Sequence, residues 1–309
     1  MTVDPAGAVQ PGTAQPGTVR AGTVEVRGVS KSYGVGPDAR EVIRDCSFDI
    51  QPGRFTVMIG PSGAGKSTLI RLLAGFEKPT AGQILIDGKP INGPGRDRQV
   101  VFQETALFPW MTTEENVLYG PKARGEMSAQ TRRRAALLLE KVGLTAFGRK
   151  YPPQLSGGMQ RRAELARAMV NDPAVMILDE PFRGLDAMTR KLMLEYYARL
   201  AEEQSSTNFF VTTDVDEAIF LADRLLVMTH IPTRVRTVVD VDLPRPRDLT
   251  TLVRDDRANQ IKMQVLSLLH EEAMKSFAQG SGRAAADFVD AYRRRLAPDE
   301  ASRAQREKI

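Results

Sequence analysis

The sequence predicts an α/β fold with a mainly parallel central sheet. Short apolar runs alternate with helical patterns from about residue 54 to residue 228, and a glycine-rich segment follows the first of these runs at residues 60–68. The pattern is helical throughout residues 105–170, which interrupts the alternation as a subdomain. Strands separated by helices are joined by crossovers, and crossovers favour parallel pairing within one sheet.

The N-terminal residues 1–21 are expected to be disordered. They are rich in Pro, Gly, Thr and Ala and carry too little apolar material to offset the entropy that ordering costs. Order is expected from about Thr23, because the valines that follow alternate with polar residues, as in a half-buried strand. A second strand pattern covers residues 42–50.

The core elements follow in order along the chain. An apolar strand at residues 54–59 leads into the glycine-rich segment, and a helix at residues 66–73 leaves it. Ser128 and Gly143 are suited to cap a helix at residues 129–142. The remaining strands are expected at residues 83–86, 99–102, 174–178, 209–211 and 225–228, and the remaining helices at residues 159–169 and 186–203.

The chain is expected to divide into three parts. The tail at residues 1–21 precedes a core domain at residues 22–243, which contains the helical subdomain, and a helical extension follows at residues 244–309. Within the extension, helical patterns cover residues 249–275 and 283–296. We expect a helix pair packed on the core; a regulatory ligand-binding domain is the alternative, although about 65 residues is small for one.

The composition is that of an ordinary globular protein, 42% hydrophobic and 26% charged. The sequence shows no apolar run near the ~20 residues that a membrane span needs and no secretory signal, so we do not expect the chain to enter a membrane by itself. The net charge is +5, but basic residues are scattered among acidic ones, so we interpret the surplus mainly as solvated surface with some attraction to the inner membrane leaflet, and we expect no nucleic-acid partner. The single cysteine, Cys46, is expected to be a small buried residue, which fits a reducing cytosol.

The segment GPSGAGKST has the composition of a phosphate-binding loop. Glycines lack a Cβ, so successive backbone amides can face phosphate oxygens, and the following helix directs its positive N-terminal end to the same place. Lys66 is expected to reach the β- and γ-phosphates of a nucleotide, and Ser67 to ligate Mg²⁺. The residues expected to hold the nucleotide are Gly60, Pro61, Ser62, Gly63, Ala64, Gly65, Lys66, Ser67 and Thr68.

The segment VMILDE ends an apolar strand with two carboxylates. Asp179 lies at the carboxyl end of the strand, where ligands bind in open α/β sheets. We expect Asp179 to hold Mg²⁺ through its water shell and Glu180 to polarise an attacking water as general base. A structural pair of carboxylates that caps the next helix is the alternative.

The segment LSGGMQ, at residues 155–160, lies between these two motifs. The three motifs in this order and spacing resemble the ATP-binding subunit of an ABC transporter, over roughly residues 23–242. The resemblance implies a P-loop NTPase core with an antiparallel N-terminal β subdomain. It also implies a head-to-tail dimer in which Ser156, Gly157 and Gly158 contact the γ-phosphate of ATP held by the partner. From the residues alone, these three also read as a helix cap and turn.

Three further positions match this family. Gln103, in VVFQE, matches a glutamine that touches Mg²⁺ and water and joins the core to the helical subdomain. Tyr33, in SKSYG, matches an aromatic residue that stacks on adenine. Asp186, in FRGLD, matches an aspartate that communicates across the dimer, and a helix-capping role is equally compatible with it.

The segment ALFPWMTTEENV resembles the surface where importer ATPases receive a coupling helix from the membrane subunit. Trp110, the only tryptophan, is expected either at that contact or in the core. Residues 94–117 are most similar to the nitrate, taurine and aliphatic sulfonate importers. The resemblance implies an ATP-hydrolysing subunit, as a homodimer or heterodimer at the cytoplasmic face of the inner membrane. Its partners would be permease subunits and, indirectly, a solute-binding protein.

The family pattern breaks in the segment VTTDVDEA. Thr213 occupies the place of a histidine that, in the family, bonds the γ-phosphate and positions water; His230 and His270 cannot be brought into register with it. Arg183 also replaces a small residue, either as a solvated charge or pointing across the dimer interface. Because the other motif residues persist, we expect a slowed ATPase. The alternatives are a nucleotide-dependent gate with little hydrolysis and a non-transport ABC ATPase, although the latter usually carries two cassettes or long coiled coils.

Overall fold

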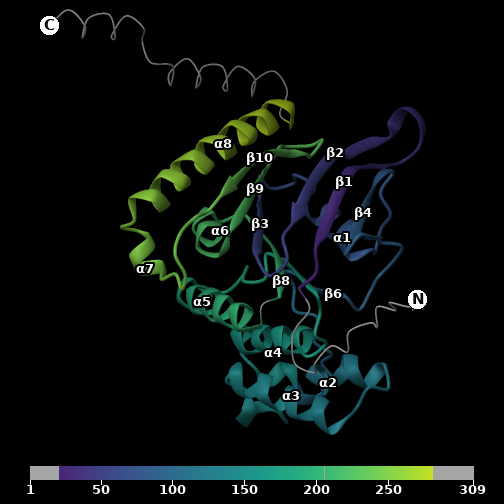
Figure 1. The fold of residues 1–309 in the computed structure, drawn as a ribbon, viewed down its shortest axis with the longest axis vertical. Coiled ribbons are helices and arrows are strands. Elements are labelled where there is room, and N and C mark those ends of the chain that lie inside the picture. The colour runs from purple at the N-terminus through teal and green to yellow at the C-terminus, as the bar shows by residue number, and fades with distance from the viewer. Residues whose placement is uncertain (1–20, 205, 281–309) are drawn as a thin grey trace, which may run out of the picture.

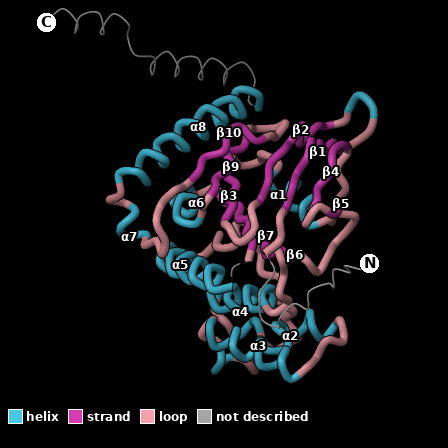
Figure 2. The backbone as a smooth tube through the Cα atoms, in the orientation of Figure 1, coloured by secondary structure: helices cyan, strands magenta, loops and turns pink. Residues whose placement is uncertain are grey.

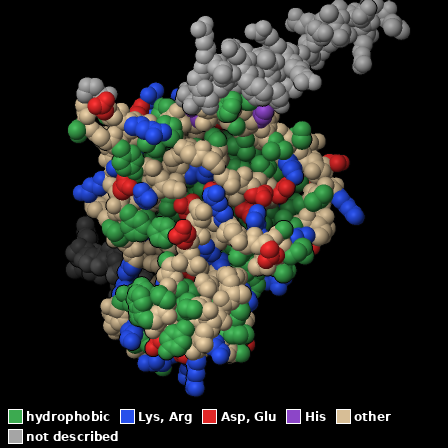
Figure 3. Space-filling view, turned by 180° about the vertical axis from the view of Figure 1, so that it is seen from behind, with side chains coloured by type: hydrophobic (Ala, Val, Ile, Leu, Met, Phe, Trp, Pro, Cys, Tyr) green, Lys and Arg blue, Asp and Glu red, His purple; other side chains and the backbone are tan. Residues whose placement is uncertain are grey.

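The computed structural model describes residues 21–204 and 206–280, whose strands form two sheets (Figures 1 and 2). The tail expected at residues 1–21 lies, except for its last residue, outside the described part, as does the helix expected at residues 283–296. None of the described helices is long and apolar enough to cross a membrane. On the face seen from behind, acidic and basic side chains are interspersed among apolar ones (Figure 3).

The central sheet contains the apolar strands that the sequence predicts. They are β3 (Phe55–Ile59), β6 (Arg98–Val101), β7 (Val175–Asp179), β8 (Thr207–Thr212), β9 (Arg224–Met228) and β10 (Val235–Asp240). The order is β10-β9-β3-β8-β7-β6, and every neighbouring pair is parallel except β9 with β10. Strand β3 is buried along its whole length, as a parallel strand covered on both faces requires. The sequence did not predict β10, because this edge strand is mostly exposed or half-buried and its apolar pattern is weak.

The second sheet is antiparallel and covers one face of the first. Its strands are β1 (Val24–Tyr33), β2 (Arg40–Ile50), β4 (Ala81–Ile86) and β5 (Lys89–Pro90), in the order β2-β1-β4-β5, with a short 3₁₀ turn, η1 (Gly36–Asp38), between β1 and β2. Cys46 lies fully buried in β2, as predicted, and burial raises the pKa of its thiol to about 11. The sequence-based fold class, with its antiparallel N-terminal sheet, is therefore confirmed.

Two hydrophobic cores lie on opposite faces of the central sheet. Because side chains alternate along a strand, Val57 and Ile59 of β3 enter one core and Met58 enters the other. The core of Met58 is shared by the antiparallel sheet and α1 (Lys66–Ala74). The other core is shared by α5 (Ala187–Gln204), α6 (Val215–Leu221) and the helices of the subdomain.

The helical subdomain forms the lower end of the molecule in Figure 1. It contains α2 (Thr113–Ala123), α3 (Ala129–Lys141) and α4 (Gly157–Met169), with 3₁₀ turns η2 (Thr145–Phe147) and η3 (Pro152–Gln154) between α3 and α4. Ser128 caps α3, as predicted, since its side chain accepts a hydrogen bond from the backbone of Thr131. Thr112 and Glu115 cap α2 reciprocally in a capping box, which the sequence analysis did not identify.

The C-terminal helices pack against the core. They are α7 (Leu249–Leu252) and α8 (Asp256–Gly280), and α8 runs along one side of the molecule, against α6 and β9 (Figure 1). Ala258, Ile261 and Val265 of α8 are buried and join the larger core. The helical pattern predicted at residues 249–275 is thus divided into two helices.

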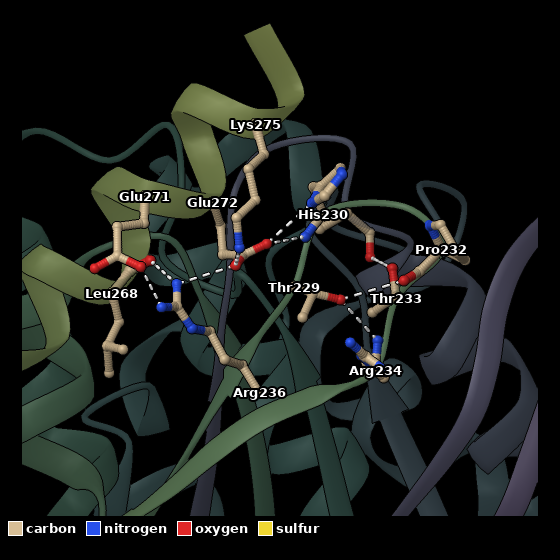
Figure 4. A network of polar contacts seen from close by, with 11 residues as sticks. Thr229, His230, Pro232, Thr233, Arg234, Arg236, Leu268, Glu271, Glu272 and Lys275 are labelled. Carbon is tan, nitrogen blue, oxygen red and sulfur yellow. Dashed lines mark hydrogen bonds and ion pairs between the residues drawn. The ribbon is translucent and has the colours of Figure 1, made fainter. Parts of the chain in front are cut away.

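A buried carboxylate fastens α8 to the loop between β9 and β10 (Figure 4). Glu272 on α8 is 1% exposed and accepts hydrogen bonds from the ring of His230 at 2.9 Å, from Arg236 at 3.0 Å and from Lys275 at 2.7 Å. Burial by itself raises the pKa of Glu272, but the hydrogen bonds from Lys275 and His230 outweigh it and lower the pKa to about 2. Glu272 is therefore charged in the folded protein at neutral pH.

The low pKa of Glu272 predicts a loss of stability in acid. In the unfolded chain this carboxyl has its ordinary pKa of 4.5. A folded-state pKa below that value stabilises the fold at neutral pH, and this stabilisation is lost as the pH falls from about 4.5 to about 2. Thermal melting is expected to depend more steeply on pH in the parent than in Glu272→Gln over this interval. An equal dependence of the melting temperature on pH in the two proteins would contradict the low pKa assigned to Glu272.

Candidate active site

The glycine-rich loop joins β3 to α1 at the carboxyl edge of the central sheet. Gly63 and Gly65 have φ angles of 75° and 71°, in the left-handed region that glycine adopts without steric cost. A Cβ on Gly65 would lie 2.8 Å from Cγ1 of Val42, so a larger residue does not fit. No described side chain caps α1, and its first backbone N–H groups are therefore available to an anion.

Lys66 lies inside this loop. Its side chain is buried, and Nζ donates to the carbonyl oxygens of Gly60 at 3.0 Å and Pro61 at 2.9 Å. Burial lowers the pKa of Lys66, and the negative charges of Glu180 and Asp179 oppose that lowering. Since an ammonium group has three donors, one remains for a phosphate oxygen.

Two oxygen ligands suited to Mg²⁺ meet beside the loop. The hydroxyl of Ser67 donates to Oδ2 of Asp179, at the end of β7, over 3.3 Å. Burial raises the pKa of Asp179, and the neighbouring charge of Glu180 raises it further, so a bound cation would relieve both effects. Within the described residues no cluster of acidic, histidine or cysteine side chains forms a metal site of its own. The pair therefore fits Mg²⁺ only if phosphate oxygens and water complete its coordination.

Glu180 follows Asp179 in a strained backbone conformation. Its φ of 41° is unusual for a residue with a side chain, and its backbone N–H donates to the carbonyl of Val211 at 2.9 Å. The carboxylate is 12% exposed and accepts a hydrogen bond from Nη1 of Arg183 at 3.1 Å. Arg183 was expected to be a solvated charge or to point across a dimer interface, but it pairs with Glu180 of its own chain. The side chain is 61% exposed, which agrees with the expectation of a solvated charge, and the pairing with Glu180 was not foreseen because the sequence analysis ignored the turn that connects the two residues.

Lys66, Ser67, Glu180 and Arg183 line one cavity of about 580 Å³, and Asp179 is not part of its lining. The cavity brings the glycine-rich loop together with Tyr33, with Gln103 and with the turn that carries Glu180 and Arg183. The sequence analysis did not identify three of the lining residues: Arg40, Val42 and Ile231. Arg40 and Val42 lie in β2, far from the motifs in sequence, and only the folded sheet brings them to the loop.

Tyr33 and Gln103 line the cavity from opposite parts of the fold. Tyr33 ends β1, and its hydroxyl donates to Glu77 at 2.7 Å while the ammonium of Lys31 lies 5.0 Å from the ring centre. Gln103 follows β6 and is exposed. Its position at the cavity fits the predicted contact with Mg²⁺ and water, and that role stays a prediction.

A buried ion pair on α4 holds the segment that carries Gln103. Arg161 and Glu164 approach to 2.5 Å, and their side chains are 5% and 3% exposed. Arg161 donates to the carbonyl oxygens of Phe102, at 2.7 Å, and of Gln103. Glu164 accepts from the backbone of Ala106 at 3.1 Å. The sequence analysis missed this pair because an i, i+3 ion pair on a helix usually lies on the surface.

The residues of the LSGG segment lie outside this cavity. Ser156 caps α4, since its hydroxyl accepts a hydrogen bond from the backbone of Met159 at 3.3 Å. Gly157 and Gly158 form the first turn of α4 against the start of α5, where a Cβ on Gly158 would lie 3.0 Å from Cγ2 of Thr189. The capping interpretation is thus correct for Ser156. Contact with a nucleotide would require a second chain.

Asp186 and Thr213 also lie outside the cavity lining. The carboxylate of Asp186 accepts a hydrogen bond from the backbone of Thr189 at 3.0 Å, as a helix-capping residue does. Thr213 follows β8 and is exposed, whereas the preceding Thr212 donates to Glu217 at 2.6 Å. Among the described residues that line the cavity there is no histidine, and His230 pairs with Glu272 instead.

Comparisons with known proteins agree with this architecture. A model of the family described as "ABC transporter" matches residues 43–183. The nitrate import ATP-binding protein NrtD of Synechococcus elongatus is 41% identical over 78% of this chain and 89% of its own. The aliphatic sulfonates import ATP-binding protein SsuB of Bacillus licheniformis is 37% identical over 83% of this chain and 98% of its own. An uncharacterized ABC transporter ATP-binding protein of Methanocaldococcus jannaschii is 38% identical over 82% of this chain and 93% of its own.

Solved structures give the same result. The dimeric structure of an ATP-binding cassette in a post-hydrolysis state, bound to ADP and Pi, is 30% identical, covers 72% of this chain and 100% of its own, and has a TM-score of 0.61. The cbiO1 protein of Clostridium perfringens is 23% identical over 86% of this chain and 98% of its own, with a TM-score of 0.65, and supports the fold. With its phosphate loop, carboxylate pair and LSGG segment in place, the chain belongs to the ATP-binding proteins of ABC transporters and is an ATPase of that family.

Proposed function

We propose that the chain powers a bacterial importer for a small anionic or zwitterionic solute of the nitrate, taurine or sulfonate kind. The observation that carries the ATPase function is that Lys66, Ser67 and Glu180 line one cavity, with Asp179 hydrogen-bonded to Ser67 beside it. The kind of solute is supported by the import functions named for two relatives at 41% and 37% identity. In this proposal the chain lies at the cytoplasmic face of the inner membrane, held there by permease subunits.

In this proposal each group of cavity residues has a separate role in ATP hydrolysis. The loop amides and Lys66 bind the β- and γ-phosphates, and Tyr33 stacks on the adenine. Ser67, Asp179 and Gln103 would hold Mg²⁺, which when bound withdraws charge from the phosphate oxygens. Glu180 accepts the proton of the water that attacks the terminal phosphorus, and ADP leaves with the electron pair of the broken P–O bond.

We propose that a second copy of this chain completes the site. The chain carries both halves that a head-to-tail pair needs: a phosphate cavity, and LSGG residues that lie outside its own cavity. Ser156, Gly157 and Gly158 of each copy would contact the γ-phosphate held by the other, and Asp186 would connect the two sites. The dimeric state of the related cassette structure supports the arrangement.

A solute assay tests the proposed import function. The chain is purified with its permease subunits and solute-binding protein and placed in lipid vesicles. Nitrate, taurine or methanesulfonate is expected to stimulate ATP turnover, and an uncharged sugar is expected to leave it unchanged. Stimulation by the sugar alone would contradict the proposed solute class and leave the ATPase assignment intact.

Trp110 supports a permease contact on the helical subdomain. Its side chain is 70% exposed, so its placement in the core, one of the two expectations, is wrong. It lies 5.5 Å from the ring of Phe108, whose other neighbours are Tyr119 at 4.6 Å and the guanidinium of Arg167 at 5.4 Å. An exposed aromatic cluster of this kind is typical of an interaction surface.

Trp110→Ala is expected to uncouple ATP hydrolysis from solute uptake. The isolated variant should lose no more than about 0.5 kcal/mol of stability, because the side chain is exposed. Its uptake in vesicles should fall at least several-fold at unchanged basal turnover. Val253→Ala removes an equally exposed apolar residue near the C-terminal helices and serves as the control. Normal uptake by Trp110→Ala would place the permease contact elsewhere.

We further propose that Thr213 slows hydrolysis. Loss of one preorganised donor to developing charge costs about 10²–10³ in rate, and a threonine hydroxyl has a shorter reach than an imidazole. Thr213→His is expected to raise turnover several-fold at unchanged affinity for ATP. A folded variant that binds ATP and turns it over no faster would show that this position does not limit the rate. A parent that binds ATP with almost no turnover would favour a nucleotide-dependent gate.

A further inference from the structure

We propose that Arg183 is a further active-site residue, which contacts the terminal phosphate of ATP in its own chain and supplies the positive charge that the missing histidine would otherwise bring. The proposal goes beyond the proposed function and rests on the role assigned there to Glu180. It is carried by the position of Arg183 on the cavity wall and by its ion pair with Glu180.

The backbone directs Arg183 into the site. The N–H of Arg183 donates to the carbonyl of Glu180 at 3.1 Å, which closes a turn. Phe182, inside this turn, is buried and packs against Tyr197 and Phe210. Gly184 ends the turn with a φ of 83°, a conformation that disfavours other residues. The backbone position of Arg183 is therefore fixed, and its side chain points back toward Glu180.

The guanidinium can move although the backbone of Arg183 is fixed. The side chain of Arg183 is 61% exposed, and Glu180 is its one hydrogen-bond and ion-pair partner among the described residues. An ion pair with so exposed a partner contributes little to the stability of the fold, because water screens the two charges. A phosphate group that enters the cavity can therefore compete with Glu180 for the guanidinium.

The charges around the cavity indicate where the guanidinium acts. Arg183 lines the same cavity as Lys66 and the glycine-rich loop. Lys66 is the residue proposed to bind the β- and γ-phosphates. Arginine binds phosphate oxygens through a planar fork of N–H donors, and an arginine that reaches the transferred phosphoryl group stabilises the charge that develops there.

One movement of Arg183 would then serve two purposes. In the structure its guanidinium donates a hydrogen bond to the carboxylate of Glu180. When Arg183 moves to the terminal phosphate, Glu180 is released to take the proton of the attacking water. ADP has no terminal phosphate at this position, so with ADP the pair with Glu180 would persist. The mechanism makes Arg183 sensitive to the difference between ATP and ADP.

Binding measurements separate this role from a structural one. Arg183→Ala is expected to weaken ATP binding about 10-fold and to leave ADP binding within about two-fold, as measured by calorimetry, because a charged hydrogen bond contributes roughly 1.5 kcal/mol. Arg44→Ala is the matched control, since Arg44 forms a similarly exposed i, i+3 pair with Glu41 and neither residue is part of the cavity lining. Equal loss of ATP and ADP affinity in Arg183→Ala would overturn the proposal.

The rate of ATP turnover provides a second test. Arg183→Ala should lower turnover about 10²-fold, and Arg183→Lys should recover part of it, because lysine keeps the charge and loses the fork. Thr213→His should restore turnover at least 10-fold in the Arg183→Ala background, more than it gains in the parent, as expected for two residues that share one role. Faster turnover in Arg183→Ala alone would show that Arg183 only restrains Glu180. Should the parent hydrolyse no ATP, the proposed function fails, and the preference for ATP over ADP still decides the role of Arg183.

Discussion

Lys66→Ala is expected to weaken ATP binding roughly 100-fold, a loss of about 2.7 kcal/mol. The buried ammonium is held by the carbonyl oxygens of Gly60 and Pro61, and it is the one lysine on the cavity lining. Its removal leaves the loop amides to bind the β- and γ-phosphates without the charge of the ammonium group. Isothermal titration with ATP and Mg²⁺ measures the effect directly.

Two further variants guard against misfolding as the cause. Lys66→Met keeps the length of the side chain and removes the charge, so it should bind ATP as weakly as Lys66→Ala. Lys141→Ala removes a surface lysine that pairs with Glu203, and it should bind ATP normally. A folded Lys66 variant with the affinity of the parent would show that the nucleotide binds elsewhere.

Glu180→Gln is expected to slow hydrolysis about 10³-fold with ATP affinity unchanged within about two-fold. The amide is nearly the same size as the carboxylate and can still accept from Arg183, so the geometry of the turn should persist. What the variant loses is the group that accepts the proton of the attacking water. Glu41→Gln alters the matched pair with Arg44 outside the cavity and should hydrolyse ATP normally. Turnover by Glu180→Gln at the rate of the parent would assign the base to another residue.

The elements with strong local signals were predictable from the sequence. The glycine-rich loop needs left-handed residues and a strand before it, and both requirements are visible in GPSGAGKST and the apolar run that precedes it. The Asp179–Glu180 pair was equally accessible, because an apolar strand that ends in two carboxylates shows where the sheet edge lies. Parallel pairing followed from the alternation of strands and helices.

The parts that depend on tertiary contacts were not predictable. Burial of Arg161 and Glu164 depends on how α4 packs against the segment after β6, and their spacing alone is that of a surface pair. The exposure of Trp110 is set by the same packing, so the sequence left it undecided. The pairing of Arg183 with Glu180 arises from a turn fixed by the burial of Phe182, which no local pattern reveals.

The central claim is that the cavity is an ATPase site that a second copy of this chain completes. The most direct measurement is the molecular mass of Glu180→Gln by sedimentation, with and without ATP and Mg²⁺. The account predicts a monomer without ATP and a dimer with it, because binding is intact and hydrolysis cannot reopen the pair. Adding Ser156→Arg, which places a bulky charge on the LSGG surface, should return the protein to a monomer that still binds ATP. A monomeric Glu180→Gln protein that is saturated with ATP would contradict the claim.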